Sequence, residues 1–470
     1  CPNGLCLSGQ CCDNENVCGF NCCGGGEICF ANACVTPGDP CYSAADCGEN
    51  QYCETALGTG QGDPINEHAV CIHDPPANGV CLDLPPNCDD PNYDPGSGVE
   101  CIPTCEYHPD PNGPLNAVKK WSWGPTATEF ANKTDVWSTP AVGRLHDTNC
   151  DGVVNHLDPP NVIFVSGNAR ETCCSCGGYT PSTCLTGVLR VLDGMTGEEI
   201  FSLDKATPSS IGFAGLSVAI GDLDRDGWMD IAAVTGEGYI AIIDATGMVK
   251  HLSDQPVGST ASSFGWGGGL AIADMDGDGF PEIAYGAVVF TTAGGGVTHK
   301  FTGAHGHGGS GWTSALSVCS DLDGTTANDQ ELLVGNAAYK HDGSVLWHRN
   351  DLPSGFSAVG NFDGTGGPEV VLVSGGQVWI LDAATGTTRI GPVTLGGTGN
   401  GGPPTVADFD GDGAPEIGVA QQNIYSMLKP DFGASTLTAV WEAPNHDLSS
   451  SVTGSTVFDF EGDGKAEVIY

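Results

Sequence analysis

A short acidic loop that returns seven times along the chain constrains the fold more than any other sequence feature. In its clearest form, Asp222 to Asp230, acids stand at positions 1, 3, 5 and 9 and a glycine at position 6. Oxygens at these positions converge only if the backbone coils tightly, and glycine accepts the positive φ that this bend needs. Carboxylates brought so close repel one another unless a cation lies among them. Ca²⁺, a hard ion that takes oxygen ligands in flexible geometry, is therefore the predicted cofactor, with up to seven ions.

The loops begin at residues 147, 222, 274, 321, 361, 408 and 459, and the copies at 147, 321 and 361 are the looser ones. The predicted metal-site residues are those at the odd positions of each loop together with its closing acid. They are Asp147, Asn149, Asp151, Val153 and Asp158; Asp222, Asp224, Asp226, Trp228 and Asp230; Asp274, Asp276, Asp278, Phe280 and Glu282; Asp321, Asp323, Thr325 and Glu331; Asn361, Asp363, Thr365, Gly367 and Glu369; Asp408, Asp410, Asp412, Ala414 and Glu416; and Asp459, Glu461, Asp463, Lys465 and Glu467.

Two other interpretations of the loops have to be weighed. The EF-hand loop shares positions 1, 3, 5 and the glycine, but it closes with an acid at position 12 between two helices. Here most copies close at position 9 between strand-like flanks, so the EF-hand is rejected for them. The first copy, with Asp158 twelve positions in, predicts a different ligand set, and in the fourth Asp329 and Glu331 compete for the closing position. The plainer alternative is that the loops are acidic surface turns without metal.

The spacing of the loops predicts the architecture. After a first interval of 75 residues, successive loops follow at intervals of 40 to 52 residues, with strand signals on both sides of each loop. Turns of the type Asp-x-x-Thr-Gly, at 193–197 and 382–386, and Asp-Ala-Thr-Gly at 244–247 mark a third and a fourth strand. A period of this length with four strands is typical of a β-propeller. We expect an all-β fold with a seven-bladed propeller of four-stranded antiparallel blades over residues 115–470, and an insertion at 170–186 in the first blade.

The N-terminal region predicts a second, disulfide-rich module. Of 23 cysteines, 17 lie before residue 106, which is typical of an oxidising compartment. We expect a small, loop-dominated cysteine scaffold over 1–56, a Pro- and Cys-rich spacer over 57–114, and an extracellular or cell-surface location. The odd count leaves one thiol over: Cys1 as a lipid-modified bacterial N-terminus, or Cys319 as a free thiol. The sequence carries no signal peptide and no apolar run long enough to span a membrane.

The acidic loops with hydrophobic strands on either side resemble the FG-GAP or VCBS repeats of integrin α-subunits and of many bacterial secreted proteins. The resemblance covers about residues 118–470. It implies a seven-bladed propeller with calcium in hairpin loops on one rim, used for adhesion or assembly. The paired cysteines Cys11-Cys12 and Cys22-Cys23 resemble granulin-like and knottin-like modules.

The net charge and the absence of familiar catalytic motifs limit the classes of function that we expect for this chain. A formal net charge of −43 argues against nucleic-acid partners and against docking on anionic lipid. No Gly-x-Ser-x-Gly or His-Glu-x-x-His motif occurs, so the chain is predicted not to be an enzyme. We expect a structural or adhesion protein that contacts surface or matrix proteins, glycans or copies of itself, and assembles at the cell surface, in a matrix or in filaments.

Alternative functions remain open at this point. A carbohydrate-binding propeller, either lectin-like or a lyase, is one. A quinone-dependent dehydrogenase is less favoured, because such blades place Trp after the Asp-Ala-Thr-Gly turn, where this chain has Met248. His299, His305 and His307 are either a transition-metal site or solvated loop histidines.

The last blade is expected to be completed by sequence from elsewhere. The chain enters its last loop at Asp459 and the sequence ends at Tyr470, whereas earlier blades go on to two more strands. Residues 117–123 read as an alternating strand and are predicted to supply the outer strand of that blade. The remaining strand is expected from a continuation past Tyr470 or from a neighbouring copy.

Overall fold

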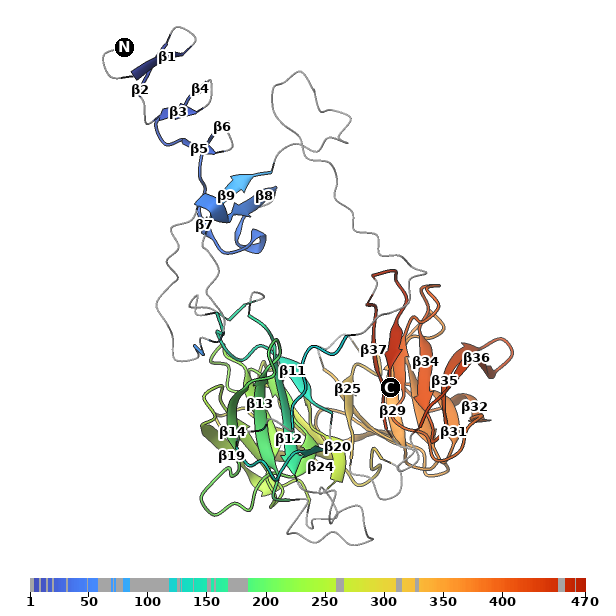
Figure 1. Ribbon diagram of the computed structural model, residues 1–470. Helices are drawn as coiled ribbons and strands as arrows, with labels where there is room; N and C mark the ends of the chain where they lie inside the picture. The colour runs from blue at the N-terminus through green and yellow to red at the C-terminus, as the bar shows by residue number, and fades with distance from the viewer. Residues whose placement is uncertain are drawn as a thin grey trace. The chain divides into compact units, whose positions relative to one another are not determined.

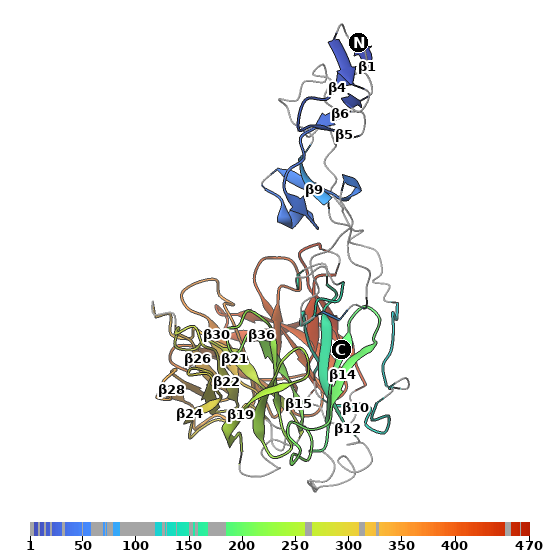
Figure 2. The ribbon, with the colours of Figure 1, turned by 90° about the vertical axis from the view of Figure 1, so that its left-hand side faces the viewer.

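The structure is a computed structural model of the chain, drawn in Figure 1 and turned by 90° in Figure 2. It describes residues 118–470 except for 125–126, 128, 138, 150–153, 156–157, 168–184, 259–265, 310–314, 326–328, 447–452 and 461. Before residue 118 it describes 4–7, 10–13, 16–18, 21–30, 33–48, 50–57, 69–70, 72 and 79–84. These residues form strands and short 3₁₀ turns, with no α-helix among them, as the all-β prediction requires. No helix among them has the length and apolar character needed to cross a membrane.

The chain divides into two compact units. One comprises Cys1–His108 together with His146–Asp158, and the other comprises Pro109–Leu145 together with Pro159–Tyr470. The segment that begins the first acidic loop therefore belongs to the N-terminal unit, although the sequence places it in the first blade of the propeller.

The larger unit contains a series of six antiparallel sheets, each with four strands that follow one another in chain order; the first sheet has β10 (Asp135–Val136) as a fifth strand. Their strands are β11 (Ala141–Gly143), β12 (Asn161–Gly167), β13 (Val188–Asp193) and β14 (Glu199–Leu203); β16 (Ala219–Gly221), β17 (Asp230–Val234), β18 (Tyr239–Ile243) and β19 (Val249–Pro256); β21 (Ala271–Ala273), β22 (Glu282–Tyr285), β23 (Val288–Thr291) and β24 (Thr298–Thr302); β25 (Val318–Ser320), β26 (Glu331–Val334), β27 (Ala337–Tyr339) and β28 (Val345–His348); β29 (Phe356–Gly360), β30 (Glu369–Ser374), β31 (Gln377–Asp382) and β32 (Thr388–Thr394); and β33 (Thr405–Ala407), β34 (Glu416–Ala420), β35 (Ile424–Asp431) and β36 (Thr436–Pro444).

Three further pairings complete this unit. A two-stranded hairpin of β37 (Thr456–Phe458) and β38 (Glu467–Ile469) follows the sixth sheet, β10 (Asp135–Val136) pairs with the end of β12, and β15 (Gly215–Ser217) pairs in parallel with β20 (Trp266–Gly269). The first strand of each sheet lies beside the first strand of the next, from β11 through to β37. This succession of radially packed sheets is the arrangement of a β-propeller. The count of seven blades stays a prediction, because the last sheet has two strands among the described residues.

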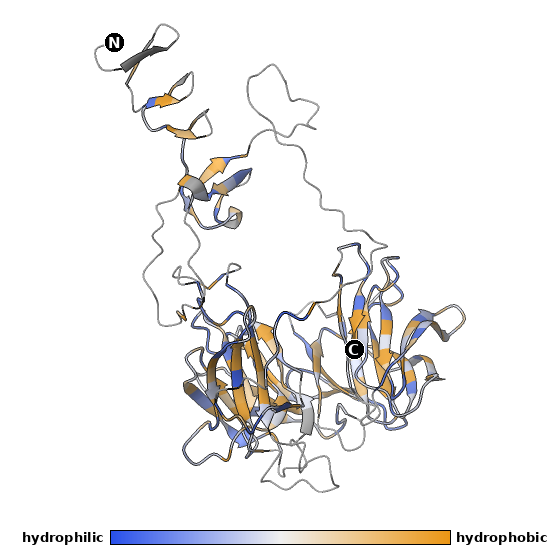
Figure 3. Ribbon diagram, in the orientation of Figure 1, coloured by the Kyte–Doolittle hydropathy of each residue, from blue (hydrophilic) through white to orange (hydrophobic). Residues whose placement is uncertain are grey.

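The core lies between the sheets, because side chains alternate between the two faces of each strand. In β17, Ile231 and Ala233 pack in the cluster shared with the first sheet, whereas Ala232 and Val234 pack in the cluster shared with the third. All four are at most 2% exposed. Figure 3 shows strands of the sheets coloured largely as hydrophobic, with short hydrophilic interruptions. Strands buried on both faces explain why these segments are continuously apolar in sequence.

The segment before the first sheet packs on that sheet. Trp121 Nε1 donates to the Gly194 carbonyl at 2.9 Å, and a Cβ at Gly197 would lie 2.7 Å from the Trp121 ring. Trp347, on β28 of the fourth sheet, packs in the same way on the turn of the fifth sheet: its Nε1 donates to the Ala383 carbonyl at 2.7 Å, and a Cβ at Gly386 would lie 2.7 Å from its ring. Trp121 thus fills the place that an outer-strand tryptophan fills elsewhere.

The predicted strand at 117–123 is nevertheless wrong for the described residues 118–123, which form no strand. A buried arginine holds the following stretch to the same sheet. Arg190, on β13, is 0% exposed, and its guanidinium donates to the carbonyls of Glu129, Phe130 and Lys133. Desolvation by burial lowers the pKa of Arg190. Five donors in a planar fork suit this role, since each can find a carbonyl or hydroxyl partner.

The N-terminal unit consists of small hairpins joined by disulfides. Its strands are β1 (Gly4–Leu7) with β2 (Gln10–Asp13), β3 (Val17–Cys18) with β4 (Asn21–Cys22), β5 (Ile28–Phe30) with β6 (Ala33–Val35), and the sheet of β7 (Pro40–Cys41), β9 (Gly79–Asp83) and β8 (Gln51–Glu54); its 3₁₀ turns are η2 (Ala44–Asp46) and η3 (Thr55–Leu57). The disulfides are Cys12–Cys22, Cys18–Cys29, Cys23–Cys34, Cys41–Cys53 and Cys47–Cys81. A module with so few buried apolar side chains depends on such bridges.

Candidate functional site

Each acidic loop joins the first and second strands of a sheet, and its closing acid fixes the turn. In all seven loops one carboxylate oxygen of the closing acid accepts the backbone N–H of the residue at position 2, at 2.8 to 3.2 Å. The pairs are Thr148 with Asp158, Leu223 with Asp230, Met275 with Glu282, Leu322 with Glu331, Phe362 with Glu369, Phe409 with Glu416, and Phe460 with Glu467. The closing acid thereby leaves its other oxygen directed at the loop. In the fourth loop this acid is Glu331, not Asp329.

The first acid and the glycine complete the coil of the backbone. In the loop that begins at Asp408, the Asp408 carboxylate accepts the N–H of Gly413 at 2.8 Å. The same bond is made by Asp222, Asp274 and Asp459 to the glycine five residues later, at 2.9 to 3.1 Å. The glycine at position 6 has φ of 86° to 90° in these four loops. A residue with Cβ would be strained there, so position 6 is fixed by backbone geometry.

At least three loops bring acidic oxygens within 4.8 Å of one another. These groups are Asp222, Asp224 and Asp230; Asp274, Asp276 and Glu282; and Asp321, Asp323 and Glu331. Clusters of oxygen ligands at this separation have the size and chemistry that suit a hard divalent cation. The individual ligand assignments made from the sequence stay predictions.

A basic side chain of the same sheet reaches into each of five successive loops, and the sequence reading missed this feature. The five side chains are Lys250, Lys300, Lys340, Arg389 and Lys429. Lys429 Nζ contacts Asp410 Oδ2 at 2.5 Å, Asp412 Oδ2 at 2.7 Å and Glu416 Oε1 at 2.8 Å. The bases stand 19 to 28 residues after the start of their loops, so no fixed spacing pointed to them.

In the fourth loop the base contacts one carboxylate, whereas the bases of the other four loops contact two or three. Lys340 Nζ contacts Asp323 Oδ2 at 2.8 Å, whereas Glu331 Oε1 is buried without a hydrogen-bond partner. Asp274 Oδ1 in the third loop is also buried without a hydrogen-bond partner. Glu331 is 0% exposed, and desolvation by burial raises its pKa. A buried carboxylate oxygen without a partner is costly, and a bound cation would remove that cost. Asp321, Asp323 and Glu331 therefore fit a divalent metal.

Burial also perturbs the closing acid of the second loop. Asp230 is 1% exposed, and desolvation raises its pKa to about 6 despite its contact with Lys250 Nζ at 3.1 Å. The pKa of Lys250 is raised, because hydrogen bonds to Asp224, Asp226 and Asp230 outweigh the effect of burial. The carboxylates thus favour the charged form of Lys250, whereas the ammonium group only partly offsets the burial that disfavours the charged form of Asp230.

The first loop differs from the others. Val70 N–H donates to the Asp147 carbonyl at 2.8 Å and Ile72 N–H to the Thr148 carbonyl at 3.0 Å, within the N-terminal unit. Asp158 accepts the N–H of Thr148 with one oxygen and that of Asn155 at 2.9 Å with the other. The predicted ligands Asp151 and Val153 of this loop, and Glu461 of the last one, lie outside the described residues.

Residues at position 7 connect neighbouring loops. The Arg225 guanidinium of the second loop lies 4.8 Å from the centre of the Phe280 ring in the third. Between the last two loops, the Lys465 side chain lies 3.0 Å from where a Cβ of Gly411 would be, and Ala466 N–H donates to the Asp408 carbonyl at 2.9 Å. The loops therefore form neighbouring contacts along the same edge of the sheets.

The histidines singled out in the sequence do not converge on one point. His299 Nε2 lies 2.8 Å from Thr302 Oγ1, and the His305 ring stacks on His348 with centroids 3.9 Å apart. His307 donates its backbone N–H to Ser354 Oγ. The geometry gives no support to a shared site for His299, His305 and His307.

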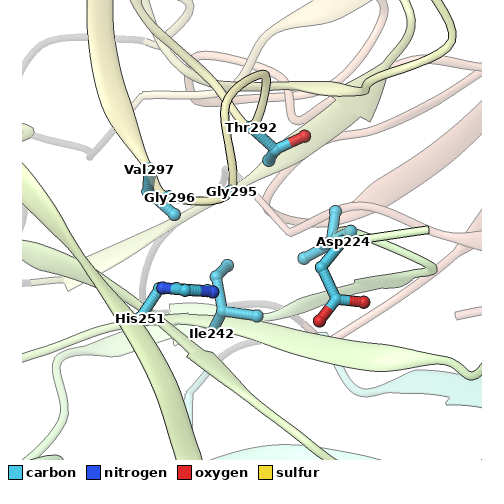
Figure 4. A pocket seen from close by; sticks show the side chains of 8 residues that line it. Asp224, Ile242, His251, Thr292, Gly295, Gly296 and Val297 are labelled. Atoms are coloured by element: carbon cyan, nitrogen blue, oxygen red, sulfur yellow. The ribbon is translucent and has the colours of Figure 1, made fainter. Parts of the chain in front are cut away.

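A small pocket lies beside the second loop, between the second and third sheets (Figure 4). Asp224, His251 and Thr292 line it together with Ile242 and the backbone of 295–297. Its volume of about 10 Å³ is that of a single water site. This pocket is therefore too small for a sugar or a quinone.

Cys319, on β25, is the free cysteine among the described residues, in line with one of the two alternatives for the unpaired thiol. Burial raises the pKa of its thiol to about 12. Cys1, the other alternative, lies outside the described residues.

Comparisons with known proteins bear on the repeat and on the fold. FG-GAP-like repeats match residues 222–285 and 361–419, which confirms the resemblance for the second, third, fifth and sixth loops. No curated protein matches the chain. Among solved structures, the chain is similar to the V. cholerae biofilm matrix protein Bap1, with 19% identity over 74% of this chain and 79% of that one and a TM-score of 0.55. This similarity supports the propeller fold.

Other similar structures are enzymes. They include the exotype rhamnogalacturonan lyase YesX, with 15% identity, 67% of each chain covered and a TM-score of 0.43. The Bacillus licheniformis rhamnogalacturonan lyase PL11 has 17% identity over 71% of this chain and 69% of that one, with a TM-score of 0.44. The prediction that this chain is not an enzyme is corrected accordingly, because the absence of familiar motifs says nothing about residues assembled on loops.

Proposed function

We propose that this chain is an extracellular structural or adhesion protein whose propeller is stabilised by Ca²⁺ and makes contacts at a cell surface or in a matrix. The single observation that carries the proposal is the repeated acidic loop, in which a buried closing acid holds the turn and directs its second oxygen at a cluster of carboxylates. Ca²⁺ suits these loops because it tolerates variable geometry and takes carboxylate and carbonyl oxygens.

The disulfides and the fold support the proposed extracellular location. Five disulfides join the described part of the N-terminal unit, and bridges of this density persist in oxidising compartments. The propeller is similar in fold to a biofilm matrix protein. We take residues 1–114 as a docking or spacer module, and surface proteins, matrix proteins or glycans as the partners of the propeller.

Calcium would act mainly through stability. An ion that binds the folded form alone stabilises it by about 2.7 kcal/mol when its concentration is a hundredfold above Kd. Several loops placed along the same edge of the sheets would add such contributions in a calcium-rich extracellular medium. The same ions would reduce the formal net charge of −43, which otherwise opposes contacts with acidic surfaces.

The test uses the full chain, stripped with a chelator and then returned to millimolar Ca²⁺. We expect the thermal unfolding midpoint to rise with Ca²⁺ by several degrees, with Mg²⁺ less effective. We also expect the calcium-loaded protein to be retained by intact cells or isolated extracellular matrix of the source organism. An unfolding midpoint that is the same with chelator and with Ca²⁺ would refute the calcium part. Protein that stays soluble beside cells and matrix under both conditions would refute the adhesive part.

A further inference from the structure

The five basic side chains in the loops are concentrated beyond what the composition of the chain suggests. The sequence has only 15 Lys and Arg against 58 Asp and Glu. One third of these bases nevertheless place their charged group at the acidic loop of their own sheet, in five successive sheets. Bases scattered over an acidic surface would not select the same loop in each sheet. Their common position therefore requires a reason.

The five basic side chains extend into the loops from different strands of their sheets. Lys250, Lys300 and Arg389 stand on the fourth strands β19, β24 and β32, whereas Lys429 stands on the third strand β35 and Lys340 directly after the third strand β27. The backbone positions are thus not equivalent from sheet to sheet. The place that the charged group occupies is the feature they share.

In two loops the ammonium group is fully engaged by carboxylates. Lys250 Nζ lies 2.7 Å from Asp224 Oδ2, 2.7 Å from Asp226 Oδ2 and 3.1 Å from Asp230 Oδ1. Lys429 makes the equivalent three contacts in the sixth loop. An ammonium group has three N–H donors, so three carboxylates use all of them. These acids are those predicted to ligate the metal, at positions 3, 5 and 9.

An ammonium and a calcium ion exclude each other from such a cluster. Ca²⁺ binds oxygen at about 2.3–2.6 Å, close to the distances from Nζ to the same oxygens. Metal binding therefore requires the ammonium to leave, and the interactions lost on its departure reduce the apparent affinity for the metal. The fourth loop escapes this competition in part, since Lys340 engages Asp323 alone and Glu331 Oε1 has no partner.

We propose that these Lys and Arg side chains are built-in counter-cations that compete with Ca²⁺ for the loop carboxylates. They hold the second, third, fifth and sixth loops closed without metal and weaken metal binding there. The fourth loop binds the divalent ion most tightly of the five. This proposal rests on calcium binding as part of the proposed function and ranks the loops within it.

The second loop offers a direct readout, because Trp228 stands at its position 7 while the equivalent residue of the third loop is Phe280. Terbium(III) replaces Ca²⁺ in oxygen sites and emits when a nearby tryptophan is excited. The full-length protein is stripped of metal and titrated with Tb³⁺, and Trp228→Phe identifies the emission that belongs to this loop. Wild type is then compared with Lys250→Met and with the control Lys119→Met, whose position is exposed and outside the loops.

In Lys250→Met, the Tb³⁺ concentration at half-maximal emission sensitised by Trp228 is expected to be lower by about tenfold or more. A tenfold change in affinity corresponds to the loss of one competing interaction of about 1.4 kcal/mol. It is also expected to lower the unfolding midpoint in chelator and to leave that in excess Ca²⁺ unchanged. Lys119→Met should alter neither. If Lys250→Met precipitates without metal, recovery of soluble protein by Ca²⁺ supports the proposal, and Lys429→Met with calorimetric Ca²⁺ titration provides the second measurement.

The outcomes separate this inference from the proposed function. Equal Tb³⁺ and Ca²⁺ affinities in wild type, Lys250→Met and Lys429→Met would overturn the competition while leaving calcium binding in place. Absence of Tb³⁺ and Ca²⁺ binding in every variant would overturn both. Loss of the tightest calorimetric site in Glu331→Gln supports the ranking, whereas an unchanged tightest site contradicts it.

Discussion

Replacing a closing acid by its neutral amide is expected to have opposite effects in two loops. Glu331 and Glu416 are both 0% exposed, and each accepts the N–H of the residue at position 2 at 2.9 Å. Gln keeps an acceptor for that bond, so the substitution changes mainly the charge. In the fourth loop the second oxygen of Glu331 has no partner, whereas in the sixth loop that of Glu416 lies 2.8 Å from Lys429 Nζ.

The expected change in the free energy of unfolding depends on the partner of this second oxygen. A buried polar oxygen left unsatisfied costs about 1–3 kcal/mol, so Glu331→Gln should stabilise the metal-free protein by about 1–2 kcal/mol. Removing one partner of a buried ion pair costs about 3–5 kcal/mol. Lys429 is a third exposed, and solvent screening reduces the expected cost of Glu416→Gln to about 1–2 kcal/mol. The two variants should therefore shift the metal-free unfolding free energy in opposite directions.

Denaturant unfolding of the chelator-treated full chain, followed by intrinsic fluorescence, measures both shifts. With Ca²⁺ a hundredfold above Kd, wild type should gain about 2.7 kcal/mol from the fourth loop, and Glu331→Gln should forfeit that gain and become the less stable protein. Shifts of the same sign for both variants in chelator would refute the distinction between a paired and an unpaired closing acid. Identical responses of wild type and Glu331→Gln to Ca²⁺ would refute metal binding at Glu331.

Three further predictions concern groups outside the loops. Because burial raises the pKa of Cys319 to about 12, its thiol should resist iodoacetamide at pH 8 in the folded protein and react after denaturation, as peptide mass analysis would show; labelling of the folded protein at the denatured rate would contradict this. Desolvation and the stacked His305 lower the pKa of His348, so the folded state binds this proton less readily than the unfolded chain and stability falls as the pH drops below about 6.5. His305→Ala should raise the His348 pKa measured by NMR, and an unchanged value would exclude the stacking partner as a cause. Trp347→Ala should cost about 3–5 kcal/mol of stability through the lost ring packing and the bond to Ala383, against less than half of that for Trp347→Phe.

The regular parts of the fold could be predicted from the sequence because they depend on local spacing. Glycine at position 6 and the acids around it fix a tight turn, and the strand-like flanks fix antiparallel neighbours, so four-stranded sheets follow from any one repeat. In five loops the closing acid could be located at position 9, and the structure shows its contact with the N–H of position 2 in each of these five. The Asp-x-x-Thr-Gly turns likewise mark the connection between the third and fourth strands.

Features that depend on contacts across the sheets could not be predicted in this way. The bases in the loops come from two different strands, and only the twist and register of each sheet bring them to the carboxylates. The first loop appeared to be a variant of the repeat, yet Asp147 and Thr148 bond to residues 70 and 72 of the N-terminal unit. Glu331 and Asp329 were indistinguishable as closing acids until the backbone showed which one reaches Leu322.

The position of the loops explains why a cation there should matter for the whole sheet. The second and third strands are buried on both faces by the neighbouring sheets, as β17 and most of β18 show, whereas the first strand β16 is only half-buried. A first strand with little burial has few apolar contacts to hold it in register, so its attachment depends on its hydrogen bonds and on the turn that joins it to the second strand. The acidic loop is that turn, and its carboxylates repel one another unless a charge of opposite sign lies among them. Lysine, arginine or a divalent ion can each supply that charge, but only the divalent ion is set by the surroundings of the protein. On the proposal above, loops whose base engages two or three carboxylates would be closed in any medium, whereas the fourth loop, whose base engages Asp323 alone, would make the stability of the molecule responsive to calcium.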